Sequence, residues 1–213
     1  MSKTICIMGE SGSGKTTSLR NLDPAETYII DADKKGLNWK GWKKQYNTEA
    51  KNYAVTNKAE KILSLLKCLN DKAPHIKTIV VDTINGIMIE HEMRLIGELG
   101  FSKWSELAYS VWAILDYSLT LRDDLTVIFM AHTQVEYNDN GYSFTRIKTN
   151  GRKLEKIVLE SKFTTVMLAK AIDGRFIFET KANNSTAKTP MGAFSETEID
   201  NDMSVILKKL EEF

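Results

Sequence analysis

Residues 9–16 read GESGSGKT, and this short stretch decides the fold that the rest of the chain is expected to adopt. It matches every fixed position of the pattern GxxxxGK[ST]. The apolar segment 3–8 precedes it as a short strand, and residues 15–20 read as the start of a helix. In that setting the glycines let backbone N–H groups wrap a phosphate, and the helix start adds its own N–H groups and dipole. We therefore interpret 9–16 as a phosphate-binding loop rather than as a glycine- and serine-rich turn.

The segments that follow the loop alternate between apolar strands and amphipathic helices. Apolar runs predict strands at 27–30, 53–55, 78–81 and 126–131. Apolar residues at helical spacing predict helices at 58–70, 84–99 and 102–122. Continuously apolar strands that alternate with helices form parallel sheets covered on both faces. The expected fold is therefore a three-layer α/β P-loop NTPase with a mostly parallel sheet.

The C-terminal third of the chain has a different character. Residues 138–141 read as a turn, and Asp173-Gly174 is a strong hairpin signal. We expect the Asp173-Gly174 hairpin to form an antiparallel edge of the sheet. The segments predicted here are a helix at 153–161, strands at 163–172 and 175–180, a polar mobile stretch at 183–190 and a helix at 204–213. We expect a core domain at 1–194 and a C-terminal tail at 195–213.

Composition limits the class of protein. The chain has 213 residues, 42% hydrophobic and 27% charged, which suits one α/β domain. Its net charge of +1 argues against a protein that is basic all over, so any nucleic-acid surface must be local. Cys6 and Cys68 lack metal-ligand spacing, and we expect both to be reduced core thiols. No apolar run approaches membrane-spanning length, so we expect a soluble, cytoplasmic protein.

A loop of this type predicts ATP and Mg²⁺ as cofactors. Lys15 would place its charge on the β- and γ-phosphates, and Thr16 would offer its hydroxyl to Mg²⁺. Asp82 closes the apolar run 79–81, as the metal-side carboxylate of a Walker B segment does, although a helix cap would look alike. Thr16 and Asp82 are the expected metal ligands. The expected nucleotide-binding residues are Gly9, Glu10, Ser11, Gly12, Ser13, Gly14, Lys15, Thr16 and Thr17.

Hydrolysis of ATP also needs a group that orients or deprotonates the attacking water. No acid follows Asp82 directly, because the next residue is Thr83. The run 30–33, IDAD, ends the second strand, where parallel-sheet enzymes place functional groups. Asp33 is the favoured candidate and Asp31 is its competitor. A purely structural turn is the third possibility.

Three segments resemble RecA-like ATPases. That family carries an I-D-A-acid run like 30–33 and a Walker B segment similar to 81–84, VDTI. It also ends the next strand in a polar residue that leads into a DNA-binding loop, as 132–134, HTQ, does here. More narrowly, residues 3–194 resemble the small phage-encoded ATP-binding proteins of the Sak recombinase group. The resemblance implies a RecA-like core, ATP hydrolysis, and single-strand annealing. In this chain the second acid is Asp33 rather than Glu, so the water would sit closer.

The resemblance also implies further site residues. Either His132 or Gln134 would sense the γ-phosphate, unless His132 only bonds a backbone carbonyl. The candidates to reach a neighbouring subunit's γ-phosphate are Lys181, Arg175 and Lys188, unless Lys181 is only an exposed lysine at a strand end. The candidate DNA-binding residues, where RecA-like proteins place their DNA loops, are Arg146, Lys148, Arg152 and Lys153. The loop 34–44 interleaves lysines with two tryptophans, which either contact DNA or pack on the domain.

The leading hypothesis is a Mg-ATP-binding, ATP-hydrolysing protein that binds single-stranded DNA and promotes annealing or homologous recombination for a phage. It would form a homo-oligomer, as a ring or filament, and a single-strand-binding protein is a further candidate partner. One alternative is a P-loop kinase, although no arginine-rich lid is evident. Others are a nucleotide-binding module that acts without DNA and a chromosome- or plasmid-handling ATPase.

Overall fold

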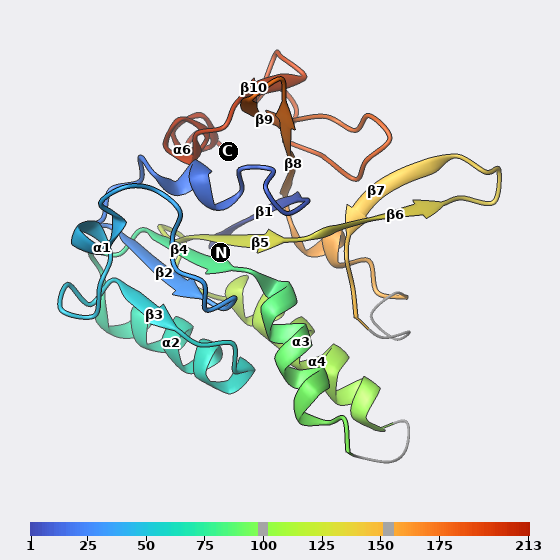
Figure 1. The fold of residues 1–213 in the computed structure, drawn as a ribbon. Helices are drawn as coiled ribbons and strands as arrows, with labels where there is room; N and C mark the ends of the chain where they lie inside the picture. The colour runs from blue at the N-terminus through green and yellow to red at the C-terminus, as the bar shows by residue number, and fades with distance from the viewer. Residues whose placement is uncertain (98–101, 151–155) are drawn as a thin grey trace.

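The computed structural model describes residues 1–97, 102–150 and 156–213. In these ranges one sheet has the strand order β10-β9-β8-β1-β5-β4-β2-β3, and a separate hairpin pairs β6 with β7 (Figure 1). The strands are β1 (Lys3–Gly9), β2 (Thr27–Asp31), β3 (Tyr53–Val55), β4 (Thr78–Asp82), β5 (Thr126–Ala131), β6 (Thr133–Tyr137), β7 (Ser143–Ile147), β8 (Thr165–Ile172), β9 (Arg175–Glu179) and β10 (Glu198–Asp200).

Helices cover both faces of the sheet. Figure 1 shows α2, α3 and α4 on one side and α6 on the other. The α-helices are α1 (Trp42–Gln45), α2 (Ala59–Lys72), α3 (Ile84–Arg94), α4 (Ser102–Ser118) and α6 (Met203–Leu210), and the 3₁₀ helices are η1 (Thr16–Leu19) and η2 (Leu159–Lys162). None of the helices in the described ranges is both long and apolar enough to cross a membrane.

Parallel pairing places the ends of the central strands side by side. β5 lies between β1 and β4, and all three run parallel. β2 pairs parallel with β4, so that Asp31 lies beside Asp82. At the opposite edge β9 and β10 pair antiparallel. The predicted three-layer α/β fold, mostly parallel with an antiparallel hairpin at its edge, is therefore confirmed.

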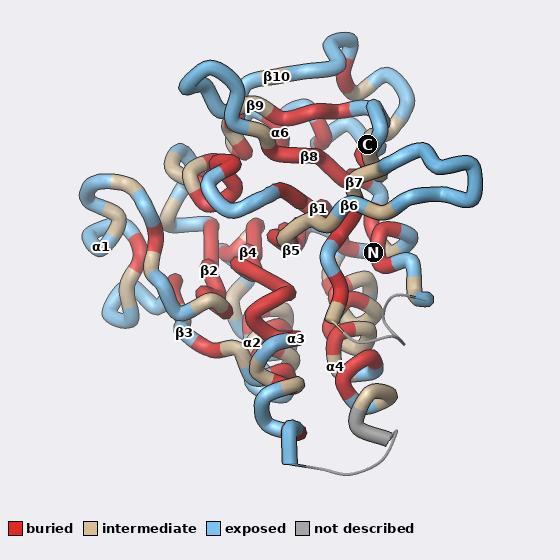
Figure 2. Tube along the Cα trace, turned by 45° about the vertical axis from the view of Figure 1, so that its right-hand side comes forward, coloured by how far each residue is buried: buried red, intermediate tan, exposed pale blue. Residues whose placement is uncertain are grey.

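The core divides into two layers because strands buried on both faces send alternate side chains to each. On one face Val81, Phe129 and Cys6 pack against α2, α3 and α4. On the other face Ile5 and Val80 pack with side chains of α6 and the loop before β3. Figure 2 shows the central strands buried and the tip of the β6–β7 hairpin exposed. Burial on both faces explains why the strands read as continuously apolar.

Several predicted helices are shorter than expected. The helix predicted at 15–20 is the single 3₁₀ turn η1, and Pro24 soon follows, which disfavours continuation. α4 ends at Ser118 rather than Arg122, and the Ser118 carbonyl at its end accepts a hydrogen bond from the Ser2 hydroxyl. α3 ends at Arg94, and the end predicted for it at Leu99 lies outside the described residues.

Other differences follow from contacts between distant segments. The helix predicted at 153–161 lies partly outside the described residues, and the described part forms only the turn η2. The stretch 183–190, predicted to be mobile, is tied to neighbouring strands by backbone hydrogen bonds. The C-terminal helix packs on the chain's own sheet, and the preceding residues add the unpredicted strand β10.

The prediction for the two cysteines is half correct. Cys6 is fully buried in β1, whereas Cys68 is exposed on α2. The helical spacing that buries Ile62, Leu66 and Leu69 turns Cys68 to the opposite face. Burial raises the pKa of the Cys6 thiol well above its ordinary value.

We expect this difference to appear in thiol chemistry, because the thiolate is the reactive form and must be accessible. In the native protein a thiol reagent such as Ellman's reagent should modify Cys68 quickly and leave Cys6 unmodified until the chain is unfolded in guanidinium. A Cys68→Ser variant should then show no rapid reaction. Equal rates for both thiols in the native protein would contradict this arrangement of α2.

Candidate functional site

The glycine-rich loop wraps a space at the carboxyl end of β1. Gly12 and Gly14 have φ angles of 80° and 92°, which favour glycine. A Cβ on Gly14 would also lie 2.7 Å from the Phe176 ring. The ammonium of Lys15 folds back into the loop and donates to the carbonyls of Gly9 and Glu10 at 2.8 Å each. The loop therefore holds a buried cation close to backbone that a phosphate can approach.

Burial has the largest effect on the pKa of Lys15. It lowers the pKa of the Lys15 ammonium to about 8, against the opposing attraction of Asp82. The nearby hydroxyl of Ser13 is buried and has no hydrogen-bond partner among the described residues. A buried donor without a partner is costly, and a phosphate oxygen would satisfy it. The loop thus has a charge and an unsatisfied hydroxyl suited to a phosphate group.

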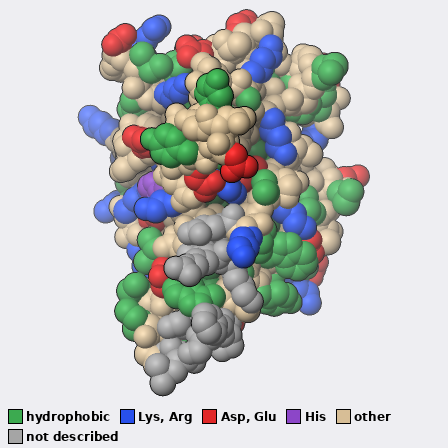
Figure 3. Space-filling model, turned by 90° about the vertical axis from the view of Figure 1, so that its right-hand side faces the viewer, with side chains coloured by type: hydrophobic (Ala, Val, Ile, Leu, Met, Phe, Trp, Pro, Cys, Tyr) green, Lys and Arg blue, Asp and Glu red, His purple; other side chains and the backbone are tan. Residues whose placement is uncertain are grey.

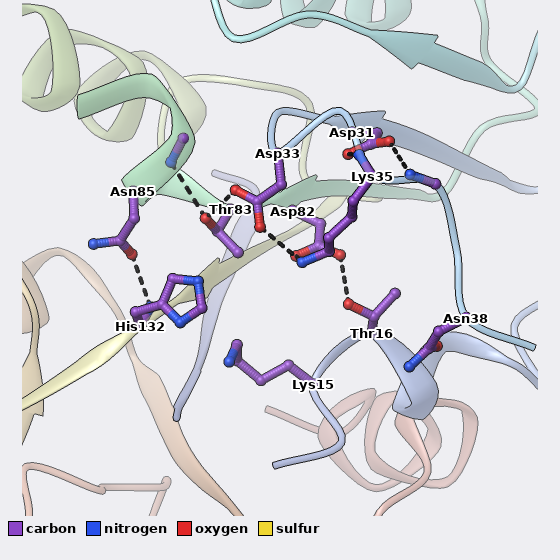
Figure 4. Close-up of polar contacts among 12 residues, drawn as sticks. Lys15, Thr16, Asp31, Asp33, Lys35, Asn38, Asp82, Thr83, Asn85 and His132 are labelled. Carbon is purple, nitrogen blue, oxygen red and sulfur yellow. Dashed lines mark hydrogen bonds and ion pairs between the residues drawn. The ribbon is translucent and has the colours of Figure 1, made fainter. Parts of the chain in front are cut away.

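The candidate metal side of the site is formed by one hydrogen bond between two elements. The Thr16 hydroxyl donates to Oδ2 of Asp82 at 2.7 Å, and Asp82 is 1% exposed (Figure 4). The other oxygen, Oδ1, is buried without a hydrogen-bond partner in the described parts of the chain. Burial raises the pKa of Asp82, while the Lys35 charge and the Thr16 hydrogen bond oppose that rise. A hydroxyl beside a carboxylate oxygen that lacks a partner fits a hard cation such as Mg²⁺.

The protein offers few metal ligands of its own. Among the described residues, no group of three or more His, Cys, Asp or Glu side chains could hold a metal. Mg²⁺ commonly takes one or two protein ligands and fills its coordination with phosphate oxygens and water. Thr16 and Asp82 fit this role, which is the one that the sequence predicted for them.

The two candidate acids have different environments. Asp31 is 1% exposed and accepts hydrogen bonds from the Tyr53 hydroxyl at 2.7 Å and the Gly36 amide at 2.8 Å. Asp33 instead lies beside the metal-side residues and accepts from Thr83 at 2.8 Å. Burial alone would raise the pKa of Asp33, but hydrogen bonds from Lys35 and Thr83 hold it below its ordinary value. Asp31 thus orders the loop, and Asp33 is the acid placed in the site.

The two candidate sensors of the γ-phosphate, His132 and Gln134, lie in different surroundings after the end of β5. Figure 4 shows the His132 ring between Asn85 and Lys15. Burial and then the charge of Lys15 lower the pKa of His132, so its imidazole is neutral at neutral pH. Gln134 belongs to the hairpin, where its amide donates to Glu136 at 2.7 Å and accepts from the Thr149 amide at 3.2 Å. The geometry favours His132 over Gln134 as the group that faces a bound phosphate.

Asn85, a residue that sequence reasoning did not single out, joins the site to the hairpin. Its Oδ1 accepts from the His132 amide at 2.7 Å, and its Nδ2 donates to the Lys148 carbonyl at 2.9 Å. Lys148 in turn donates from its amide to the His132 carbonyl at 2.8 Å. Asn85 is the second residue of α3, three positions after Asp82. It therefore connects the segment after the metal-side carboxylate to both strands at the base of the hairpin.

Three further residues that were not predicted from the sequence contact the residues of the site. Thr83 caps α3 by accepting from the Gly86 amide while its hydroxyl donates to Asp33. Gly86 lets the Ala32–Asp33 backbone approach, because a Cβ there would lie 2.5 Å from the Ala32 carbonyl oxygen. A glycine in the first turn of a predicted helix was the available signal for this close approach. Asn38 donates to the Thr17 hydroxyl at 2.9 Å and links the 34–44 loop to the phosphate loop.

The remaining predicted residues do not gather at this site. β9 starts near the phosphate loop and runs antiparallel to β8, so Lys181 lies past its far end and donates to the Ser195 carbonyl at 3.3 Å. Arg146 is buried and forms ion pairs with Glu136 and Glu160, so it adds nothing to an exposed basic surface. Lys148 is exposed. Arg152 and Lys153 lie outside the described residues.

The tryptophans of the 34–44 loop pack on the domain itself. Trp39 lies edge-on to Tyr46 with ring centroids 6.1 Å apart, and its indole N–H donates to Gln45. Trp42 packs against Tyr53 at 5.4 Å. These contacts favour the interpretation in which this loop covers the sheet over the one in which it stacks on bases.

Comparison with known families supports the nucleotide site. The model of the AAA domain family matches residues 1–191. A comparison with curated proteins found no match. The match supports a P-loop ATPase-type domain, which is the coarser part of the resemblance noted in the sequence. The narrower resemblance to the Sak group stays a prediction.

The close approach at Gly86 can be tested with alanine. Gly86→Ala gains about 1 kcal/mol of helix propensity, but overpacking against Ala32 and Asp33 costs about 1–3 kcal/mol. We therefore expect a net loss of up to about 2 kcal/mol in urea denaturation and a displaced Asp33. Gly97→Ala is the control, because a Cβ at Gly97 meets no atom of the described residues within 4 Å. If both variants kept the stability of the wild type, the close contact between α3 and the Asp33 loop would be wrong.

Proposed function

The chain belongs to the AAA domain family, and we propose that it binds and hydrolyses Mg-ATP and couples nucleotide state to single-stranded DNA through the β6–β7 hairpin. One observation carries the catalytic part of the proposal. The Thr16–Asp82 hydrogen bond of 2.7 Å joins the phosphate loop to a nearby strand end and leaves Oδ1 of Asp82 without a hydrogen-bond partner among the described residues. A site that held only a phosphate would not need a buried carboxylate there.

Each residue of the site has a role that follows from its surroundings. Lys15 would exchange its bonds to loop carbonyls for bonds to phosphate oxygens, helped by the loop amides. Thr16 and Asp82 would hold Mg²⁺, which neutralises phosphate charge when bound. Asp33, ionised and fixed by Thr83, would orient the attacking water. The neutral His132 ring would face the terminal phosphate.

The proposed coupling runs through Asn85. A phosphate beside His132 would act on a residue whose amide and carbonyl both take part in the hydrogen bonds at the hairpin base. Because Asn85 also holds the Lys148 carbonyl, a shift of the first turn of α3 would move both strands together. Segments that respond to a terminal phosphate in this way are a common form of nucleotide switch.

The hairpin has the features of a single-strand contact. Figure 3 views the side on which it projects, where hydrophobic side chains stand at the surface among charged ones. Tyr137 and Tyr142 flank its turn and are 75% and 70% exposed. Exposed aromatic rings can stack on bases, and the exposed Lys148 can neutralise a phosphate. On this basis we propose single-strand annealing or recombination by a homo-oligomer as the biological activity.

The assignment of the two acids predicts different variant behaviour. Asp33→Asn should lower the rate of ATP hydrolysis by roughly 10²–10⁴-fold, because it removes the water-orienting carboxylate. Its affinity for ATP should change little, as measured with a fluorescent ATP analogue. Asp31→Asn should instead lower stability by about 1–3 kcal/mol, because its buried partners lose a charged acceptor. Normal hydrolysis by Asp33→Asn would exclude it as the catalytic acid.

The DNA contact is tested by the ATPase rate with and without single-stranded DNA. We expect stimulation in the wild type and its loss in a Tyr137→Ala/Tyr142→Ala variant, with the basal rate unchanged. Stacking is worth about 1–3 kcal/mol per base, so DNA affinity should fall about tenfold or more. Tyr109→Ala is the matched control, because Tyr109 is 66% exposed on α4.

The same assay separates the alternatives. Equal stimulation of the double variant and the control would remove the hairpin from the DNA contact. Tight nucleotide binding without hydrolysis would indicate a nucleotide-binding module. Transfer of the terminal phosphate to a small acceptor would indicate a kinase and overturn the ATPase proposal.

A further inference from the structure

Lys35 lies at the metal side of the site, although no motif includes it. Its ammonium lies 2.7 Å from Oδ2 of Asp33 and 3.7 Å from Oδ1 of Asp82 (Figure 4). The Lys35 side chain is 45% exposed, whereas that of Asp82 is 1% exposed. One flexible side chain therefore reaches from the surface to two carboxylates that belong to different strand ends.

The oxygen that Lys35 approaches on Asp82 is the one available to a cation. Oδ2 of Asp82 is occupied by the Thr16 hydroxyl, whereas Oδ1 accepts no hydrogen bond from the residues that the structure describes. The ammonium of Lys15 does not fill this position, because it is bonded to the carbonyls of Gly9 and Glu10. Lys35 therefore supplies the positive charge that faces both Asp33 and Oδ1 of Asp82.

The backbone around Lys35 is anchored by contacts that do not involve its side chain. The Gly36 amide donates to Asp31 at 2.8 Å, and Lys34 and Gly36 adopt left-handed φ angles of 57° and 76°. A lysine ammonium on a four-carbon stem can leave a carboxylate without any movement of such a loop. The turn therefore fixes where the stem starts and leaves the charged end able to withdraw.

We propose that Lys35 is a positioning residue that acts as the resident counter-ion of Asp33 and Asp82, and that its ammonium and a divalent cation exclude one another. This inference rests on the proposed function, because it takes Asp82 as the metal-side carboxylate. In the nucleotide-free protein the Lys35 ammonium lies against both carboxylates and holds them in place. With Mg²⁺ held at Oδ1 of Asp82, the Lys35 ammonium would lie away from that oxygen.

Mutual exclusion predicts that removal of the ammonium strengthens binding of the metal alone. Mn²⁺ serves as the probe without nucleotide, with free Mn²⁺ measured by electron paramagnetic resonance and Mg²⁺ added as competitor. Lys35→Met should bind Mn²⁺ about three- to tenfold more tightly than the wild type, a range suited to a partly exposed ion pair. Lys35→Arg, which keeps the charge, should resemble the wild type.

Lys34→Met is the matched control. It makes the same charge change in the same loop, and Lys34 is exposed and forms no ion pair within the described parts of the chain. Its effect on Mn²⁺ affinity should be less than twofold. Unchanged or weaker binding by Lys35→Met, or equal gains in both variants, would overturn the proposal.

A measurement on the wild type covers the case in which Lys35→Met fails to fold. Amine labelling mapped by mass spectrometry should show Lys35 becoming more reactive relative to Lys34 when Mg²⁺ is added. No change in that ratio at saturating Mg²⁺ would overturn the proposal. These measurements use no nucleotide, so failure of ATP hydrolysis would be seen separately and would bear on the proposed function alone.

Discussion

The buried carboxylate of Asp82 is the charge around which the site is organised. A carboxylate taken out of water costs several kcal/mol unless it is paired and hydrogen-bonded. Thr16 satisfies one of its oxygens, and the Lys35 ammonium lies 3.7 Å from the other. The phosphate loop, the Asp33 loop and the Walker B strand are thereby held around a single charged group. On the proposed mutual exclusion, a divalent cation would replace the ammonium, since it offers more charge to the same oxygens.

The order of the strands turns this local arrangement into a candidate switch. Because β5 lies between β1 and β4, its end meets the phosphate loop on one side and Asp82 on the other. His132 directly follows β5 and precedes the hairpin, so any group that binds beside it is close to the hairpin base. Asn85 adds a second connection from α3. The hairpin projects away from the sheet (Figure 1), which suits an element that moves.

Much of the fold and part of the site could be predicted from sequence, for physical reasons that differ between residues. The phosphate loop and Asp82 were readable because their chemistry requires fixed residue types next to an apolar strand. The choice between Asp31 and Asp33 was not, because it depends on partners such as Tyr53 and Thr83 that are distant in sequence. The position of Lys35 beside the two acids and the role of Asn85 could not be predicted for the same reason. Cys68 was wrongly predicted to be buried, because α2 buries only one of its faces and Cys68 lies on the other.

The role of Asp82 is tested most directly by the effect of Mg²⁺ on ATP affinity in the wild type and in Asp82→Asn. We predict that Mg²⁺ strengthens ATP binding to the wild type and that most of this gain is lost in Asp82→Asn, while metal-free ATP binding is retained through Lys15 and the loop amides. Isothermal titration calorimetry with and without EDTA measures both quantities. An equal gain from Mg²⁺ in the two proteins would contradict the assignment of Asp82 as the metal-side carboxylate.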